Sequence, residues 1–429
     1  MIGLRAPLDR TLLLMRDELR ASVSDTALLT ALTSTEIALV ADAETLVSPA
    51  AQTAFVSTAL LCVRSGHKVY LLAPDVDFAV AQPPPLGTRL IGALLQADGH
   101  IVPARRLVTQ IPDHEVDLEI RLGSSPSVCK AKAQLTMTAT PWSVVIERGS
   151  RQSTWPGDLT WPIGAMAGST LAAAEAFKCT MRKLVCFARE AALFTEFFRP
   201  LEATTFTLAP ASTAMHSDLG MFDLVSGGAI TNGTLYALSR LPQVRGIGRV
   251  IEPDIAEITN LNRYMLLLTD HLGGAKANHL AGLDLGSLTI KPLPWRFKSK
   301  HSLGALGPRV LVGVDHIPTR WTVQRARPRW LGIGATTHWS AMASCHSPAT
   351  ACAGCAHPRD DTAEGAIPTV AFVSFMAALL QTTYFLRELT GDSMSEQLAY
   401  VTLPRAEKIW RSPVARRPGC PVCHAAVAA

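Results

Sequence analysis

Four cysteines occur as two pairs with the same spacing, Cys352-Ala-Gly-Cys355 and Cys420-Pro-Val-Cys423. A gap of two residues lets both thiolates of a pair reach one metal ion, and two such pairs are typical of a closed tetrahedral zinc site. A shared Zn²⁺ would hold the last residues of the chain against the first pair. Two disulfides, or four unrelated buried thiols, are the alternatives. Such a zinc site is structural, so any chemistry has to come from residues upstream.

A glycine-rich turn joins a predicted strand to a predicted helix in the second half of the chain. The apolar run Met221–Val225 precedes Ser226-Gly-Gly-Ala-Ile-Thr-Asn-Gly233, and we expect a helix to start at Thr234–Leu238. A second strand ends with Val250-Ile251 and is closed by Glu252. Glycine lets the backbone approach a phosphate, a helix N-terminus supplies N–H donors, and a terminal acid can hold ribose hydroxyls. This order predicts a nucleotide-binding unit, with a purely structural glycine turn as the alternative.

Three further polar segments follow in a fixed order: Glu252-Pro-Asp-Ile-Ala-Glu-Ile-Thr-Asn-Leu-Asn-Arg263, Gly273-Gly-Ala-Lys276 and Val310-Leu-Val-Gly-Val-Asp-His-Ile-Pro-Thr-Arg320. With the glycine turn and the two cysteine pairs, this succession resembles the ubiquitin-activating superfamily, which includes the adenylyltransferases of thiamine and molybdopterin biosynthesis. The order and spacing match over Phe222–Cys423, about half the chain. The resemblance implies an ATP-dependent adenylyltransferase with ATP, Mg²⁺ and Zn²⁺ as cofactors.

The resemblance also implies a role for individual residues. A guanidinium and an ammonium group would stabilise the charge that moves onto leaving pyrophosphate, and a carboxylate would bind Mg²⁺ together with phosphate oxygens. The implied backbone contacts to phosphate are Gly228 and Ala229, the ribose ligand is Glu252, the phosphate contacts are Asn262, Arg263 and Lys276, and the magnesium ligand is Asp315.

Four positions depart from the family pattern. Ser226 and Thr231 stand where glycines are usual, His316 replaces an asparagine, and Glu252 replaces an aspartate. These departures affect the detailed geometry of the turn and of the magnesium site. They also keep open a different class of function, a degenerate nucleotide-binding scaffold that holds a partner without catalysis.

Ubiquitin activation adds a second step, in which a cysteine thiolate captures the adenylated carboxylate as a thioester. The loop after Cys355, where many relatives carry that cysteine, has none before Ile367. The nearest candidate is Cys345, which we expect in a polar loop where His346 could lower its pKa. The alternatives are an incidental loop cysteine, a substitute zinc ligand, or no thioester step at all.

The first half repeats the arrangement without its glycines. Glu36–Asp42 reads as a first strand, and His67–Asp75 parallels the segment that ends at Asp254. Between strand and helix, Ala43–Ala50 has no glycine, and Glu44 stands where phosphate would lie. We therefore expect two Rossmann-like lobes that form an internal pseudo-dimer, in the α/β class.

The expected lobes are residues 1–205, without a nucleotide site, and residues 206–429, with the ATP site and the zinc cysteines. In related homodimers an N-terminal arginine often reaches the ATP site of the partner. The candidates here are Arg5, Arg10, Arg16 and Arg20, among which the sequence does not choose. Helices Met166–Leu184 and Thr369–Leu389 are expected to meet in the interface between the lobes.

The expected activity is ATP-dependent adenylation of the C-terminal carboxylate of a ubiquitin-like protein, with possible transfer to a conjugating enzyme. The organisation resembles the single-chain activating-like proteins of bacterial conjugation operons, including antiphage systems. Sulfur-carrier activation without a thioester is the nearest alternative. A nicotinamide dehydrogenase is disfavoured because Arg263, Lys276 and Asp315 suit pyrophosphate and magnesium rather than hydride transfer.

Composition limits the other classes of function. Charged residues make up 17% and the formal charge is +5 without a dense basic cluster, so we expect no nucleic-acid partner. Gly365–Leu386 is free of charge, but it contains a proline and several polar residues, so we expect a buried helix rather than a membrane span. Nine cysteines with a thiolate zinc site, and no apparent signal peptide, predict a reducing cytoplasm.

Overall fold

The computed structural model describes residues 2–19, 23–149, 153–298, 306–358, 365–392, 395–420 and 422–423. The helices and strands of the first lobe are α1 (Ile2–Arg5), α2 (Asp9–Leu19), α3 (Asp25–Thr33), β1 (Glu36–Val40), η1 (Thr45–Val47), α4 (Pro49–Arg64), β2 (Lys68–Leu72), α5 (Leu90–Ala97), β3 (Leu107–Val108), β4 (Leu118–Leu122), β5 (Gln134–Ala139), β6 (Ser143–Arg148), α6 (Ile163–Lys183), η2 (Val185–Phe187), α7 (Ala191–Phe197) and β7 (Ala203–Thr207). Those of the second lobe are β8 (Asp218–Val225), α8 (Ala229–Leu238), β9 (Arg245–Ile251), η3 (Ile258–Asn260), η4 (Thr269–His271), α9 (Lys276–Ala281), β10 (Ser287–Leu293), β11 (Arg309–Val312), α10 (Ile317–Arg325), β12 (Trp330–Thr337), β13 (Ser340–His346), α11 (Ala353–Ala356), α12 (Ala371–Leu389), β14 (Leu398–Thr402), η5 (Leu403–Arg405) and β15 (Trp410–Ser412).

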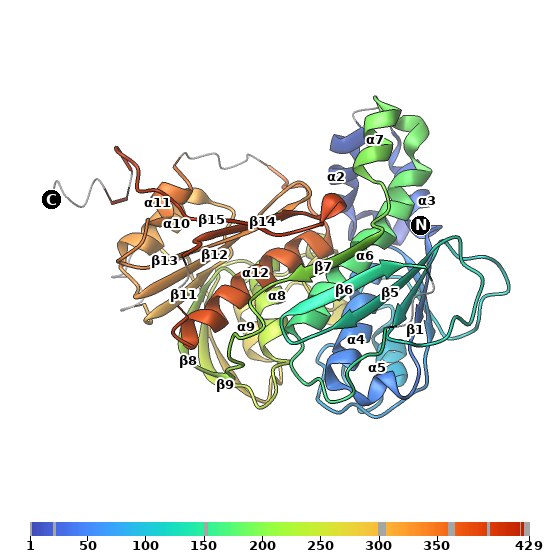
Figure 1. Cartoon of the computed structure of the whole chain (residues 1–429). Coiled ribbons are helices and arrows are strands. Elements are labelled where there is room, and N and C mark those ends of the chain that lie inside the picture. The colour runs from blue at the N-terminus through green and yellow to red at the C-terminus, as the bar shows by residue number, and fades with distance from the viewer. Residues whose placement is uncertain are drawn as a thin grey trace.

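Within the described residues, the strands form two mixed sheets, one of seven strands and one of eight (Figure 1). Their orders are β3-β2-β1-β4-β5-β6-β7 and β10-β9-β8-β11-β12-β13-β14-β15. When β8 is taken as the first strand of its sheet, the two orders are identical and β15 is an addition at the edge. In each sheet the first five strands in chain order are parallel and the later ones antiparallel. The predicted two-lobe α/β fold is confirmed.

The two lobes meet through the helices α4, α6, α8 and α12, which lie between the sheets (Figure 1). The α6–α12 contact brings the rings of Phe177 and Phe372 to 5.5 Å between centroids. Across α4 and α8, the hydroxyls of Ser57 and Tyr236 lie 3.0 Å apart. Small residues let these helices approach closely: a Cβ added to Gly233 would lie 2.6 Å from the Cβ of Ala378. One hydrophobic core therefore runs through both lobes.

Helix α8 begins earlier than we expected from the sequence. It starts at Ala229, with Gly228 as its N-cap, rather than at Thr234. The intervening Ile-Thr-Asn-Gly has weak helix propensity, but most of it is buried where α8 packs against α12. Tertiary packing, which supplies most of the stability of helices in proteins, therefore overrides the local preference. The consequence is that the glycine turn leads directly into the first turn of the helix.

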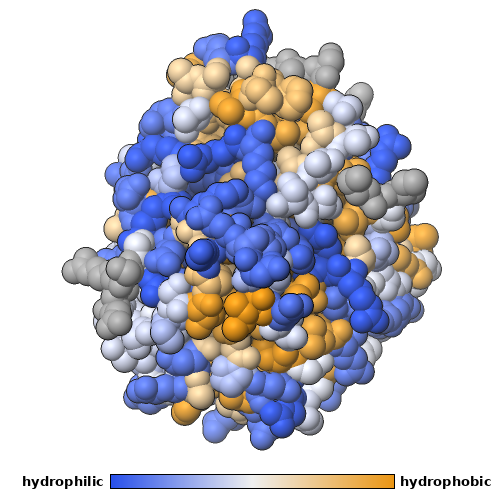
Figure 2. Space-filling model, turned by 90° about the vertical axis from the view of Figure 1, so that its right-hand side faces the viewer, coloured by the Kyte–Doolittle hydropathy of each residue, from blue (hydrophilic) through white to orange (hydrophobic). Residues whose placement is uncertain are grey.

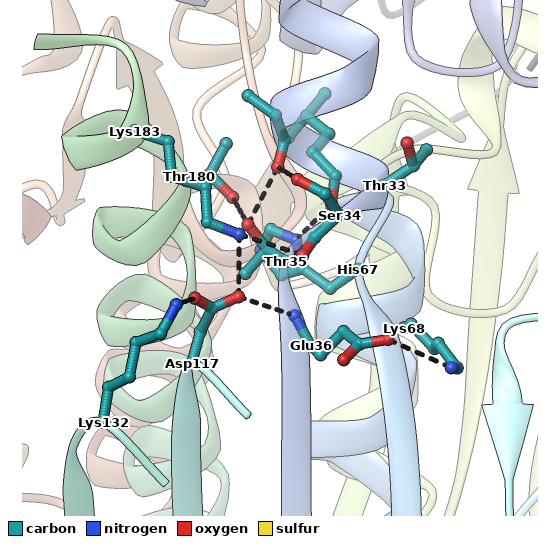
Figure 3. A network of polar contacts seen from close by, with 12 residues as sticks. Thr33, Ser34, Thr35, Glu36, His67, Lys68, Asp117, Lys132, Thr180 and Lys183 are labelled. Carbon is teal, nitrogen blue, oxygen red and sulfur yellow. Dashed lines mark hydrogen bonds and ion pairs between the residues drawn. The ribbon is translucent and has the colours of Figure 1, made fainter. Parts of the chain in front are cut away.

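A polar network holds the first lobe together at the amino ends of its central strands (Figure 3). The carboxylate of Asp117 accepts hydrogen bonds from Lys183 Nζ at 2.7 Å, Lys132 Nζ at 2.9 Å and the amide of Glu36 at 3.1 Å. Although burial raises it, these donors bring the pKa of Asp117 below its ordinary value. The network ties the end of α6 to β1 and β4. It lies at the amino ends of the strands, whereas open α/β sheets bind ligands at the carboxyl ends.

The surface on the side of the first lobe is mixed (Figure 2). Hydrophilic side chains cover its centre, and apolar side chains gather below them. Within the described residues, no helix has both the length and the apolar character needed to cross a membrane. The uncharged stretch Gly365–Leu386, which we expected to be a buried helix rather than a membrane span, supplies most of α12. This helix is buried between the lobes.

Candidate active site and metal centre

A cavity of about 1560 Å³ opens at the carboxyl ends of the central strands of the second sheet. Its walls include the glycine turn after β8, the segment after β9 and the segment after β11. This crevice is the position where open α/β sheets bind nucleotides. Among the predicted residues, those that line it are Gly228, Ala229, Glu252, Arg263, Lys276 and Asp315.

Two side chains, those of Ser226 and Glu252, accept hydrogen bonds from the backbone amides of the glycine turn and the segment after β9. Ser226 has a φ of 102°, in the region that favours glycine, and its Oγ accepts the amide of Gly228 at 2.9 Å. The carboxylate of Glu252 accepts the amides of Gly227 at 2.5 Å and Asp254 at 3.0 Å. A Cβ on Gly227 would lie 2.8 Å from the Cγ of Glu252, so this position requires glycine. Glu252 therefore braces the turn while it also faces the cavity.

Two cations from the segment after β9 face the cavity beside an aromatic ring. The guanidinium of Arg263 lies 5.4 Å, and the Nζ of Lys276 5.7 Å, from the ring centre of Tyr264. Burial lowers the pKa of Arg263. Burial also opposes the charge of Lys276, but Tyr264, Glu252 and Asp254 raise its pKa above the ordinary value. Both groups line the cavity, where an anion would meet them.

A third cation, Arg10 of α2, comes from the first lobe and also lines the cavity. Its Nε is buried without a hydrogen-bond partner, and its charge helps to lower the pKa of Arg263. Arg5 and Arg16 instead bind Asp25, both at 2.7 Å. The remaining candidate, Arg20, lies outside the described residues. Of the described N-terminal arginines, the structure thus brings Arg10 to this cavity.

Asn262 lies behind the cavity wall rather than on it. Its side chain is fully buried, and its amide donates to Thr11 Oγ1 at 2.9 Å and to the carbonyl of Thr369 at 3.2 Å. Its Oδ1 accepts the Nη1 of Arg263 at 2.8 Å. In this arrangement Asn262 orients Arg263 and connects α2 to the second lobe. Direct contact of Asn262 with phosphate stays a prediction.

Asp315 is exposed in the cavity just after β11. The preceding carbonyl, that of Val314, accepts two hydrogen bonds from the guanidinium of Arg320, at 3.0 and 2.8 Å. His316 is the N-cap of α10, and its Nδ1 accepts the amide of Thr319 at 3.2 Å. His316, which stands where the family that the motifs resemble usually has asparagine, thus caps a helix. An exposed carboxylate in a cavity that cations also line suits Mg²⁺, which keeps waters and phosphate oxygens as further ligands.

The expectation of an exposed loop around Cys345 is wrong. Cys345 lies in β13, opposite Gly332, and is 6% exposed. Burial raises the pKa of its thiol to about 12. His346 does not activate it, since burial lowers the pKa of this imidazole to about 4 and its two nitrogens contact Ser344 Oγ and the carbonyl of Ala351. The polar residues that suggested a loop satisfy one another inside the sheet.

The corresponding place in the first lobe is filled by the protein itself. Ser48, the N-cap of α4, accepts the Nε1 of Trp155 at 3.1 Å and donates to the carbonyl of Leu159 at 2.7 Å. That carbonyl also accepts the amide of Ala50 at 3.1 Å. Glu44, which we expected at the place where phosphate would lie, is exposed at the start of the turn. Trp155 and Leu159 are the groups that cover the helix N-terminus.

The four predicted zinc cysteines converge on one point. The Sγ atoms lie within 4.8 Å of one another, with separations of 3.4, 3.7 and 3.8 Å for three of the pairs. Tetrahedral ligands at a Zn–S distance of about 2.3 Å are about 3.8 Å apart, so this cluster could hold zinc. Backbone amides of Arg417 and Val422 point at two of the sulfurs, at 3.4 Å each. A Cβ on Gly354 would lie 2.9 Å from the Sγ of Cys420, so the first pair needs its glycine.

Sequence reasoning missed several residues around the cavity. Asp254 stood inside a recognised motif and Tyr264 directly follows the same motif, but neither was given a role. Met342 and Tyr400 line the cavity from β13 and β14, where they are direct neighbours across the strands. Alternation along these strands could have indicated an open face, whereas its continuity with the nucleotide crevice depends on the tertiary fold.

A family model described as the BilD N-terminal domain matches residues 36–194, in the first lobe. The protein y4jF of Sinorhizobium fredii is 36% identical over 118 residues, which are 27% of this chain and 22% of that protein. The match thus spans about a fifth of the length of this curated relative. Solved structures that the chain matches include Escherichia coli MccB with succinimide, with a TM-score of 0.42, 16% identity and coverage of 68% of this chain and 97% of that chain. MccB in complex with N-formylated MccA has a TM-score of 0.42, 14% identity and coverage of 67% and 97%.

The strained φ of Ser226 leads to a stability prediction. Glycine at this position should give a larger free energy of unfolding than alanine, by about 1 kcal/mol, because only glycine adopts a positive φ without cost. Ser34 is the C-cap of α3 and has a φ of −84°. At this position the alanine variant should have a larger free energy of unfolding than the glycine variant, by about 0.4–1 kcal/mol. Denaturant unfolding of the four variants measures both differences. If the glycine and alanine variants ranked in the same order of stability at both positions, the backbone of Ser226 would not be strained.

The cysteine cluster predicts one Zn²⁺ per chain. Cys355→Ser should reduce zinc content to well below one and destabilise the second lobe, because structural zinc contributes on the order of 10 kcal/mol to folding. Metal analysis and thermal unfolding measure the two effects. Cys186→Ser is the control, because Cys186 is exposed and lies outside the cluster. Full zinc content in Cys355→Ser would exclude this ligand set.

Proposed function

We propose that the protein adenylates the C-terminal carboxylate of a ubiquitin-like protein with ATP. The observation that carries the proposal is the convergence of three cations, Arg10, Arg263 and Lys276, with the carboxylate of Asp315 around one cavity at the glycine turn. A triphosphate needs several positive groups, and Mg²⁺ needs a carboxylate beside them. The motif resemblance supplies the reaction class.

In the proposed reaction, a carboxylate oxygen of the carrier attacks the α-phosphorus of ATP, and the bond to pyrophosphate breaks. Arg263 and Lys276 would stabilise the negative charge that grows on the leaving group, and Arg10 would add a cation from the other lobe. Asp315 would hold Mg²⁺, which neutralises phosphate charge when it is bound. Glu252 would hold the ribose, while it keeps the Gly227 amide fixed.

The size of the cavity supports a second, extended substrate. Pockets for small ligands are usually about 300–1,000 Å³, and this one is about 1560 Å³. It continues from the phosphate side past Thr337 to Met342, Leu398 and Tyr400. A flexible C-terminal segment of a carrier protein would fit along this part and place its carboxylate beside the α-phosphate. The ubiquitin-like identity of that carrier rests on the motif resemblance.

Adenylation without capture on Cys345 is the form that the geometry favours. A buried thiol with a raised pKa is a poor nucleophile, since the thiolate is the reactive species. We therefore favour activation of the sulfur-carrier type, without a thioester, over activation of the thioester type. A conjugating enzyme as second partner and a role in antiviral defence are inferred from the resemblance alone.

The adenylation proposal is tested by ATP–pyrophosphate exchange with Mg²⁺ and a small carrier protein ending in glycine. Asp315→Ala and Arg263→Ala should each reduce the exchange rate at least about 100-fold, because these groups act on charge that develops as pyrophosphate leaves. Carrier binding, measured by calorimetry, should be nearly unchanged. Wild-type exchange by Asp315→Ala would refute the magnesium assignment.

Arg10 gives a prediction with a control on the same helix. Arg10→Ala should weaken ATP binding about 10-fold, since it removes one cation from the phosphate side of the cavity. Arg16→Ala is the matched control, because Arg16 pairs with Asp25 and does not line the cavity. Calorimetric titration with ATP measures both. Equal affinities for the two variants would remove Arg10 from the site.

The filled first lobe predicts one ATP per chain. Trp155 and Leu159 occupy the N-terminal turn of α4, whereas the amide-bearing turn of α8 faces an open cavity. Calorimetry should therefore give a stoichiometry of one. Arg263→Ala should weaken that single binding event, and a second ATP bound per chain would contradict the assignment of a silent lobe.

A further inference from the structure

The interface between the lobes contains two arginines that occupy equivalent places. Arg64 is the last residue of α4, and Arg240 follows the end of α8, so each lies at the C-terminal end of the α-helix that follows the first strand of its sheet. Both guanidinium groups are buried, at 0% and 2% residue exposure. Each one reaches across the interface into the loop that follows the second strand of the opposite lobe.

Arg64 is held almost entirely by backbone carbonyls of the nucleotide lobe. Its Nη1 donates to Leu261 O at 2.6 Å, and its Nη2 donates to Met265 O at 3.2 Å and Leu267 O at 2.7 Å. A fourth bond, to Ile101 O, is longer at 3.4 Å. Burial lowers the pKa of this guanidinium to about 9, so it still carries its charge near pH 7.

The carbonyls that Arg64 binds belong to the segment that carries the candidate phosphate residues. Leu261 directly precedes Asn262 and Arg263, and Tyr264 lies between the bound carbonyls. Residues 261–267 lie outside the sheets and have no strand ladder to satisfy their backbone groups. Buried carbonyls need donors, and a planar guanidinium supplies several in a fixed geometry. Arg64 therefore fixes this backbone from behind while the side chain of Arg263 lines the cavity in front.

Arg240 makes the mirrored contact without such a consequence. It donates to Gln82 Oε1 at 3.0 Å and to the carbonyls of Pro83 at 3.1 Å and Pro84 at 3.3 Å, and it stacks on the ring of Tyr236 at 3.2 Å. The loop that it holds belongs to the first lobe, whose nucleotide place is filled. The two arginines thus have similar burial and similar contacts, but only the loop held by Arg64 carries a residue of the proposed ATP site.

We propose that Arg64 is a positioning residue, through which the lobe without a nucleotide site sets the position of Arg263 in the other lobe. This proposal rests on the adenylation function. It goes beyond it by making catalysis depend on a side chain that touches neither ATP nor carrier. An error of about 1 Å in a positioned group can cost up to about 100-fold in rate.

The test compares Arg64→Lys with Arg240→Lys in the full chain. Lysine keeps the charge but cannot donate to several carbonyls in the same planar geometry. In ATP–pyrophosphate exchange, Arg64→Lys should lower kcat at least about 10-fold with KM for ATP changed less than about threefold, and Arg240→Lys should leave both within about threefold. Arg64→Gln, which is neutral and keeps an amide donor, is the second variant if Arg64→Lys does not fold. Equal kcat losses at the two positions, or none at Arg64, would overturn the proposal.

Amide hydrogen exchange gives a readout that does not depend on activity. Arg64→Lys should speed exchange within residues 258–268 and leave 78–86 unchanged, and Arg240→Lys should do the reverse. Uniform acceleration throughout the chain would mean a merely structural role and would overturn the positioning claim. If the wild-type protein shows no pyrophosphate exchange with any carrier, the adenylation proposal falls, and hydrogen exchange alone decides whether Arg64 holds the segment.

Discussion

The structure depends on the burial of four helices between two sheets. Each helix has too little polar surface to lie at an exposed face, and α4 is buried along almost its whole length. Placing α4 and α6 against α8 and α12 removes the apolar faces of both lobes from water in one step, which is the dominant favourable contribution to folding. The lobes are therefore parts of a single core. Polar groups caught in that core need partners from the opposite lobe, and the contact of Ser57 with Tyr236 and the carbonyl contacts of Arg64 satisfy this requirement.

This shared core explains why the site draws on both lobes. The segment after β9 has little regular structure, so neighbouring elements must hold it. Thr11 of α2 accepts the amide of Asn262, and the adjacent Arg10 projects to the cavity from the same helix. The carbonyl of Arg10 also accepts the amide of Thr369, which connects α2 to the start of α12. The first lobe thus supplies a cation, a backbone anchor and a wall to the cavity of the second lobe.

The features that could be predicted from the sequence are those encoded locally. The cysteine spacing indicated the cluster, and the apolar runs ending at Val225 and Ile251 indicated parallel strands whose carboxyl ends meet at one edge. The features that could not be predicted depend on contacts between distant segments. Choosing Arg10 among the N-terminal arginines needs the position of α2, which lies more than 200 residues from the segment that it meets. Cys345 looked exposed because serine and histidine surround it, yet the register with Gly332 buries it.

Two of the four departures from the pattern of the family that the motifs resemble have local explanations. His316 can replace asparagine because an imidazole nitrogen also caps the first turn of α10. Ser226 takes a positive φ, which costs about 1–3 kcal/mol for a residue other than glycine, but its hydroxyl satisfies the amide of Gly228 in return. That amide is one of the donors that a phosphate would meet at the start of α8. Binding a phosphate there would require the hydroxyl to rotate away or to contact the phosphate itself. Because Glu252 holds the Gly227 amide from the other side, the hydroxyl can move while the turn stays in place.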